Sequence, residues 1–209
     1  KDPVPAFVKD RSMSLMQVLR RRSALYRKST TWPMQVSRVA RRFLANDEAF
    51  RTAPPLIANS FPKSGTHLLT QILEAFPGAR SYGTVWASMP GLPHRERPKS
   101  VMLRRILRAA PGEVIQAHLH FEPEYPAAIE SRRAAHFFIY RDLRDVVVSE
   151  AHYLTDMNRW HSLHRHYRKL PTLEDRIAFA ITGSSDPDFP YDYPDVGTRF
   201  ARSRPWLDR

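Results

Sequence analysis

The chain has 209 residues, of which 42% are hydrophobic, and this favours one folded domain of α/β size over a disordered chain. It contains no cysteine, which excludes disulfides, thiol catalysis and cysteine metal sites, and no stretch approaches the ~18 consecutive apolar residues of a membrane-spanning helix. The net charge of +12 suits a polyanionic partner such as nucleic acid, anionic lipid or a phosphorylated substrate. No nucleic-acid-binding motif accompanies this charge, so we expect no specific nucleic acid partner.

The first 50 residues hold eleven Lys and Arg against four acidic residues. Apolar residues recur there at helical spacing in two groups, which predicts two short amphipathic helices broken near residues 30–33 (Met13, Met16, Leu19; Val36, Val39, Phe43). Their faces could pack on the main domain or on an anionic membrane, and the charge equally fits a solvated helix. We therefore treat residues 1–53 as a basic, helical N-terminal extension and residues 54–209 as the main domain.

The start of the chain carries no signal peptide pattern, because no apolar segment follows its basic residues. The first residue is Lys1 and not Met, which is compatible with a missing N-terminal portion. We expect a cytoplasmic protein, with peripheral membrane contact through residues 1–50 as one option.

The main domain begins with a strand, a polar turn and a helix. Residues 56–61 form a short, mostly apolar run after two prolines, which is typical of a buried strand. A polar turn follows at residues 62–66, and then a helix whose apolar residues share one face as far as Phe76. Pro77 and Gly78 stop that helix. The order is strand, phosphate-sized loop, helix.

The following segments alternate in the same way. We expect a Gly- and Pro-rich loop at 81–100, helices at 101–110, 124–133, 145–154, 173–181 and 197–207, and strands at 113–120 and 136–140. Asp142 and Thr172 are suitable N-caps for two of these helices. The alternation predicts an α/β fold with a central parallel sheet covered by helices on both faces.

The loop after the first strand has the chemistry of an anion site. A helix N-terminus presents unpaired N–H groups and a positive dipole end, which favour a bound phosphate or sulfate. Gly65 allows close approach of the backbone, Ser64 and Thr66 add hydroxyl groups, and Lys63 adds a positive charge. The Walker pattern is absent, because Lys63 precedes the glycine. An ordinary strand-to-helix turn is the plainer interpretation.

A second segment, residues 141–149, has two further phosphate donors. Arg141 leaves the end of a strand, and Ser149 lies two turns into the next helix. Ligands of open parallel sheets bind outside the carboxyl ends of the strands, where both loops emerge. Alone, this Arg- and Asp-rich helix start would be interpreted as a capping and ion-pair cluster.

Together the two segments resemble the sulfotransferases that use 3′-phosphoadenosine 5′-phosphosulfate (PAPS). Residues 62–66 (Pro-Lys-Ser-Gly-Thr) look like the family's 5′-phosphosulfate loop, and residues 141–149 (Arg-Asp-Leu-Arg-Asp-Val-Val-Val-Ser) look like its 3′-phosphate segment. The resemblance covers about residues 54–209 and is to cytosolic-type domains of the bacterial kind. It implies a P-loop-like, three-layer αβα domain without a metal cofactor. It also implies transfer of a sulfuryl group from PAPS to an acceptor hydroxyl or amine, leaving adenosine 3′,5′-bisphosphate.

The resemblance assigns the donor-binding and catalytic residues. Lys63 would stabilise charge on the departing 5′-phosphate, and Arg141 and Ser149 would hold the 3′-phosphate. The 5′-phosphate would be held by the backbone and side chains of the loop (Lys63, Ser64, Gly65, Thr66, His67). His118 resembles the family's catalytic base in a His-Leu-Pro motif, which here reads His-Leu-His. His120 is the alternative base.

Two features depart from the family or compete with it. Gln116 stands where familiar members have a lysine, and the Arg-Lys-Gly segment that closes over the nucleotide is not found, so we expect the domain to be incomplete at its C-terminal side. The histidines at 152, 161, 164 and 166 match no common zinc pattern, so no metal site is expected, and most of them are assigned to a surface loop. The alternative function is a catalytically incomplete module that binds a nucleotide or polyanion. The acceptor, a small molecule, glycan or lipid, is not identified by the sequence.

Overall fold

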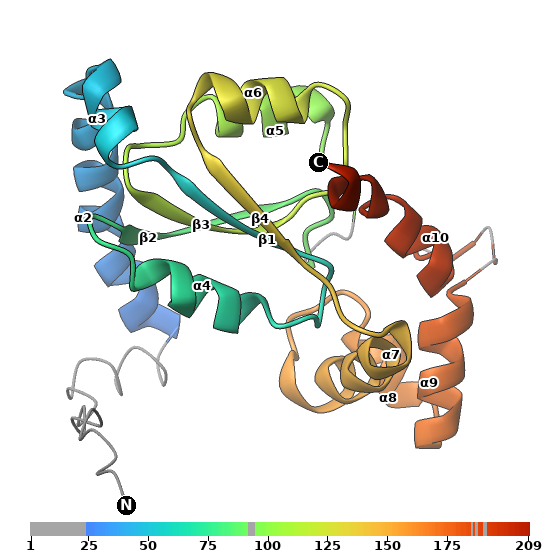
Figure 1. Cartoon of the computed structure of the whole chain (residues 1–209). Helices are drawn as coiled ribbons and strands as arrows, with labels where there is room; N and C mark the ends of the chain where they lie inside the picture. The colour runs from blue at the N-terminus through green and yellow to red at the C-terminus, as the bar shows by residue number, and fades with distance from the viewer. Residues whose placement is uncertain (1–23, 92–94, 185, 187, 190–191) are drawn as a thin grey trace, which may run out of the picture.

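The computed structural model describes residues 24–91, 95–184, 186, 188–189 and 192–209 (Figure 1). In this part of the chain the sheet has four strands, all parallel, in the order β2-β3-β1-β4. The strands are β1 (Leu56–Ser60), β2 (Arg80–Ala87), β3 (Glu113–His118) and β4 (Ala135–Ile139). Every residue of β1 is buried, as expected for a central strand covered on both faces.

Helices cover both faces of this sheet. On one face lies α4 (Thr66–Glu74), and on the other lie α5 (Lys99–Ile106) and α6 (Tyr125–Ser131) (Figure 1). The second face holds the larger core, in which Ile57 and Ile115 pack with Trp86, Met102 and Trp206. The expected α/β fold with a parallel sheet flanked by helices is therefore confirmed.

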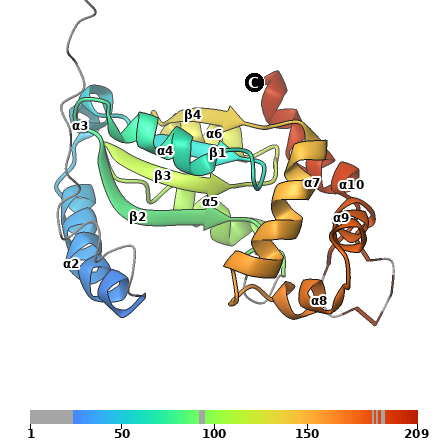
Figure 2. The same ribbon diagram turned by 90° about the horizontal axis from the view of Figure 1, so that it is seen from below.

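A group of helices lies beyond the carboxyl ends of the strands (Figure 2). It contains α7 (Leu143–His152), which continues as the π-helical turn η1 (Tyr153–Met157), then α8 (His164–Lys169) and α9 (Leu173–Thr182). These helices share a second core around Tyr167 and Tyr193. The predicted caps are confirmed, since Asp142 accepts from the Arg144 backbone N–H and Thr172 forms a capping box with Asp175.

Two predictions about the main domain are wrong. The expected loop at 81–100 begins with the edge strand β2, whose alternation is hidden by Gly83 and by a register shift between Ser81 and Val85. The expected helix at 197–207 is two pieces, α10 (Val196–Ala201) and the 3₁₀ turn η2 (Arg204–Asp208). The break precedes Pro205, which cannot donate a helical hydrogen bond.

The N-terminal region also differs from the prediction. The first expected helix lies in residues 1–23, outside the described residues, but no break occurs near Pro33, because α2 (Ala24–Phe43) runs through it. The short helix α3 (Asp47–Thr52) then leads to β1. A proline inside a helix removes one hydrogen bond, and tertiary contacts of the later residues offset this loss.

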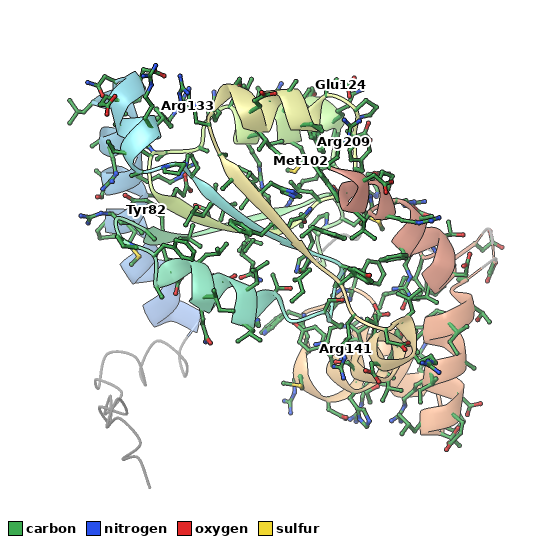
Figure 3. All side chains as sticks on the ribbon, viewed as in Figure 1. Tyr82, Met102, Glu124, Arg133, Arg141 and Arg209 are labelled. Atoms are coloured by element: carbon green, nitrogen blue, oxygen red, sulfur yellow. The ribbon has the colours of Figure 1, made fainter. Side chains whose placement is uncertain are left out.

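The second half of α2 packs on the domain. The Gln35 side-chain amide donates to the Tyr82 carbonyl at 3.0 Å (Tyr82 is labelled in Figure 3). Arg38 Nε donates to Glu113 Oε1 at 2.6 Å. Glu113 is fully buried and also accepts from Thr84 and from the Ala110 backbone.

Within the described residues, no helix combines the length and apolar character needed to cross a bilayer.

Candidate functional site

The carboxyl ends of three adjacent strands meet at one point. Ser60 ends β1 opposite Ile139 of β4, and the Phe61 backbone N–H donates to the Ile139 carbonyl at 3.1 Å. His118 ends β3, and its Nδ1 lies 3.1 Å from the Ser60 carbonyl oxygen. The loop after β1, the base candidate and the segment after β4 are therefore neighbours.

The loop between β1 and α4 contains a residue other than glycine with a positive φ, which is an unusual backbone conformation. Lys63 has φ +65° and Gly65 has φ +96°, and only the second is a glycine. A non-glycine residue in the left-handed region costs about 1 kcal/mol or more, and such residues cluster at functional sites. The turn is closed by the Ser64 N–H, which donates to the Phe61 carbonyl at 3.2 Å.

The N-terminus of α4 is open to a ligand. Its N-cap is Gly65, and no described side chain caps the helix. The Ser64 hydroxyl is buried and has no hydrogen-bond partner among the described atoms, while the Thr66 hydroxyl lies 2.5 Å from that of Ser60. A buried hydroxyl without a partner costs about 1–3 kcal/mol. Ser64 is thus ready to donate to an anion, whereas Thr66 is already used inside the loop.

Lys63 joins the loop to the segment after β4. Its ammonium lies over the ring of Tyr153, 3.7 Å from the ring centroid, in a cation–π contact. Partial burial lowers the pKa of Lys63, and the nearby carboxylate of Glu150 opposes that shift. Tyr153 and Glu150 follow Ser149 closely on the same helical segment, so the two sequence motifs lie side by side.

Asn59 fixes this junction, and sequence reasoning missed it. Its side-chain oxygen accepts from the backbone N–H groups of Ser60 at 3.0 Å and Leu119 at 2.9 Å. Its amide nitrogen lies 3.1 Å from Nε2 of His136 on β4. Because Asn59 is fully buried, these three polar contacts satisfy its side chain inside the protein. A polar residue inside an otherwise apolar strand was the available signal.

The surroundings of His118 select one tautomer. The Ser60 carbonyl, 3.1 Å from Nδ1, can only accept, whereas the Ser60 hydroxyl, 3.2 Å from Nδ1, can donate or accept. We assign the proton to Nδ1, which leaves a free lone pair on Nε2. Burial lowers the pKa of His118, and the positive charges of His67 and Lys63 lower it further, whereas the backbone hydrogen bond opposes this. The ring is therefore neutral near pH 7 and able to accept a proton at Nε2.

His120 lies on the same side but in a different environment. Its Nδ1 is 3.2 Å from Glu96, and burial also lowers its pKa. Both rings line a cavity of about 120 Å³, so location alone does not separate the two base candidates. Of the two, only His118 contacts Ser60, the last residue of β1 before the loop.

The same cavity contains a buried ion pair that sequence reasoning did not identify. Glu150 accepts from Nη1 of Arg199 at 2.9 and 3.0 Å, and Arg199 Nη2 donates to the Ala180 carbonyl at 2.6 Å. The Arg199 guanidinium also lies over the Tyr193 ring. Glu150 and Arg199 are 49 residues apart in the sequence, so no local sequence pattern indicates that they pair.

Arg141 precedes the N-cap of α7, and Ser149 lies within the helix. Arg141 is beside the junction of β4 with α7 in Figure 3, half exposed, and pairs with Asp145 through Nε and Nη2 at 2.9 Å. Exposed pairs of this type contribute about 0.2–1 kcal/mol, so a phosphate can compete for the guanidinium. Ser149 is partly buried and precedes Glu150.

The remaining histidines are distributed differently from expectation. His67 is exposed on α4 and, with Gln116, lines a wide hollow of about 540 Å³ between α4 and β2. His164 and His166 lie on α8 and not in a loop, and His166 packs on Phe179 at 4.2 Å. In the described part of the chain, no group of three metal-ligating side chains occurs.

Comparisons with known proteins give no identification. No protein-family model, curated protein or solved structure matches the chain.

Proposed function

We propose that this chain transfers a sulfuryl group from PAPS to an acceptor hydroxyl or amine. The observation that carries the proposal is that the loop between β1 and α4, His118 and the segment after β4 meet at the carboxyl ends of β1, β3 and β4. Open parallel sheets bind nucleotides at this edge. The P-loop-like character of the domain is part of the same proposal.

The donor fits the groups that the loop leaves unsatisfied. The uncapped N-terminus of α4 and the Ser64 hydroxyl suit the 5′-phosphosulfate, and the φ of Gly65 suits close backbone approach. Lys63 and the backbone N–H groups of Thr66 and His67 would complete this end of the site. Arg141 and Ser149 would hold the 3′-phosphate, once Arg141 leaves Asp145.

Transfer then needs a base and a cation, and both are present. The donor supplies an electrophilic sulfur, whose bond to the 5′-phosphate oxygen breaks as a bond to the acceptor oxygen forms. Nε2 of His118 takes the acceptor proton, and Lys63 stabilises the negative charge that grows on the leaving phosphate. No metal participates in this proposal.

A second candidate is a module that binds the nucleotide without transferring sulfate. Gln116 provides no positive charge beside His118, and Arg141 is paired with a residue of its own helix. Both features would weaken catalysis or donor binding without removing the anion site.

The two candidates are separated by following radiolabelled sulfate from PAPS into a panel of hydroxyl and amine acceptors. We expect label transfer by the wild-type chain, loss of transfer with retained nucleotide binding in His118→Ala, and mainly lower kcat in Lys63→Ala. His120→Ala is the matched control and should keep most activity. Nucleotide binding without transfer across the panel would support the second candidate instead.

A further inference from the structure

A second polar hollow lies beyond the candidate site, on the helices that face the strand ends. It measures about 500 Å³ and is lined by residues of η1, the following loop and α8 (Thr155, Asp156, Arg159, His164, Arg168). None of these residues belongs to the proposed donor or base set. The helix α8 belongs to the group of helices that lies beyond the strand ends in Figure 2.

One lining residue of this hollow, Thr155, has an unused hydroxyl. Thr155 is only 2% exposed, and its hydroxyl is buried without a hydrogen-bond partner among the described residues. The residue lies in η1, a single π-helical turn that extends α7. Such turns are rare, and those that occur are frequently found at functional sites. The unsatisfied hydroxyl and the irregular turn therefore coincide at one position.

Two of the five lining residues of the hollow are arginines. Arg159 and Arg168 are exposed, and neither forms an ion pair with any described carboxylate. The His164 ring is held in place by its Nδ1, which donates to the Leu154 carbonyl at 2.7 Å. The one carboxylate in the lining, Asp156, lies 3.9 Å from Nδ1 of His152, which is not itself a lining residue.

This combination selects an anion over other ligands. Two guanidinium groups repel metal cations, and the lining offers few apolar atoms for a hydrophobic ligand. A guanidinium fork and a hydroxyl match the oxygens of a tetrahedral anion, and charge-assisted hydrogen bonds of this type are the strong ones. We propose that the hollow binds a sulfate or phosphate group through Arg159, Arg168 and Thr155.

The proposal does not depend on the activity proposed above. If the chain is a sulfotransferase, the hollow gives it a second anion site distinct from the donor loop. If it is not, the hollow is still an oxyanion site. The source of the group is either a free ion or an ester carried by a larger molecule, and both share the same recognition chemistry.

The test is an NMR titration of the isotope-labelled full chain, following the backbone amides of residues 153–169. The probes are inorganic sulfate, inorganic phosphate and methyl phosphate, each at constant ionic strength. We expect saturable shifts at these residues and about a tenfold weaker affinity in Arg159→Gln, Arg168→Gln and Thr155→Val, since each removes one donor to the anion. Stronger binding of methyl phosphate than of inorganic phosphate would assign the site to an ester, and the reverse would assign it to the free ion.

Two controls keep the result specific. Arg165→Gln removes an equal charge from the exposed surface of α8 without touching the hollow, and it should leave the affinity unchanged. Ser64→Ala alters only the donor loop, and it should leave these shifts unchanged as well. The proposal is overturned if no saturable shift occurs, or if Arg165→Gln weakens binding as much as Arg159→Gln does.

Discussion

At the scale of single residues, the sulfate transfer proposed above would depend on the protonation of His118. Its pKa is lowered, mainly by burial, from the ordinary value of a histidine, so the neutral form persists below pH 6.5. Only this form can accept a proton, and activity is therefore lost on the acid side as pH falls through the lowered pKa. We expect the acid limb of kcat/KM for sulfate transfer to have its midpoint below pH 6.5.

The measurement is a series of initial rates between pH 4.5 and 8 at limiting acceptor, with stability checked at each pH. His120→Ala should shift this profile little. A midpoint well above 6.5, or a profile that disappears in His120→Ala and survives in His118→Ala, would show that His118 is not the base.

At the scale of elements, His136 makes β4 sensitive to acid. Its ring stacks on Trp206 with centroids 4.2 Å apart, and burial lowers its pKa from 6.5 to about 4. Below pH 6.5 the unfolded chain takes up a proton that the folded chain does not, so stability is lost as pH falls from 6.5 towards 4. The loss from this residue is about 3 kcal/mol for a shift of this size.

Urea unfolding of wild type and His136→Gln at pH 7 and pH 4.5 measures this contribution. Glutamine can still accept from Asn59 but does not titrate, so the variant should lose less stability on acidification. An equal loss in both proteins would contradict the assigned role of burial at this position.

The buried pair of Glu150 and Arg199 connects α7 to α10. Their side chains are 11% and 13% exposed, so removing one partner leaves a nearly buried charge alone. We expect Glu150→Leu and Arg199→Met each to lower the free energy of unfolding by about 3–5 kcal/mol. The double variant should be more stable than either single variant, because no unpaired charge remains.

A double-mutant cycle measured by urea unfolding gives the coupling directly. Arg144, which pairs with Asp142 on the exposed face, provides the matched control, and Arg144→Ala should have a small effect. Additive effects of Glu150→Leu and Arg199→Met would show that the pair contributes no coupling.

At the scale of the whole molecule, the N-terminal helix is held by another buried carboxylate. Glu113 is fully buried, and Arg38 of α2 supplies its charged partner while Thr84 and Ala110 supply hydrogen bonds. We expect Arg38→Met to lower the free energy of unfolding by about 3–5 kcal/mol, because Glu113 keeps an uncompensated charge. Adding Glu113→Gln should recover part of this loss, and limited proteolysis should show whether α2 has been released. A free energy of unfolding equal to that of the wild type in Arg38→Met would contradict the role of this ion pair in holding α2.

The sequence predicted much of the central architecture and less of its periphery. The buried run of β1, the turn with Lys63 and Gly65 and the capped start of α7 follow local rules, so the strand, loop and helix order could be inferred. The edge strand β2 could not, because a glycine and a register shift break its alternation. The roles of Asn59 and Glu150 depend on contacts between residues distant in sequence, which no local pattern encodes.

The central claim is that the site at the carboxyl ends of the strands recognises a nucleotide with a 3′-phosphate. The most direct test is calorimetric titration of the chain with adenosine 3′,5′-bisphosphate, compared with ADP and repeated with Arg141→Ala. We expect adenosine 3′,5′-bisphosphate to bind at least tenfold more tightly than ADP, and Arg141→Ala to remove most of that preference. Equal affinity for the two nucleotides, or binding of neither, would contradict the claim.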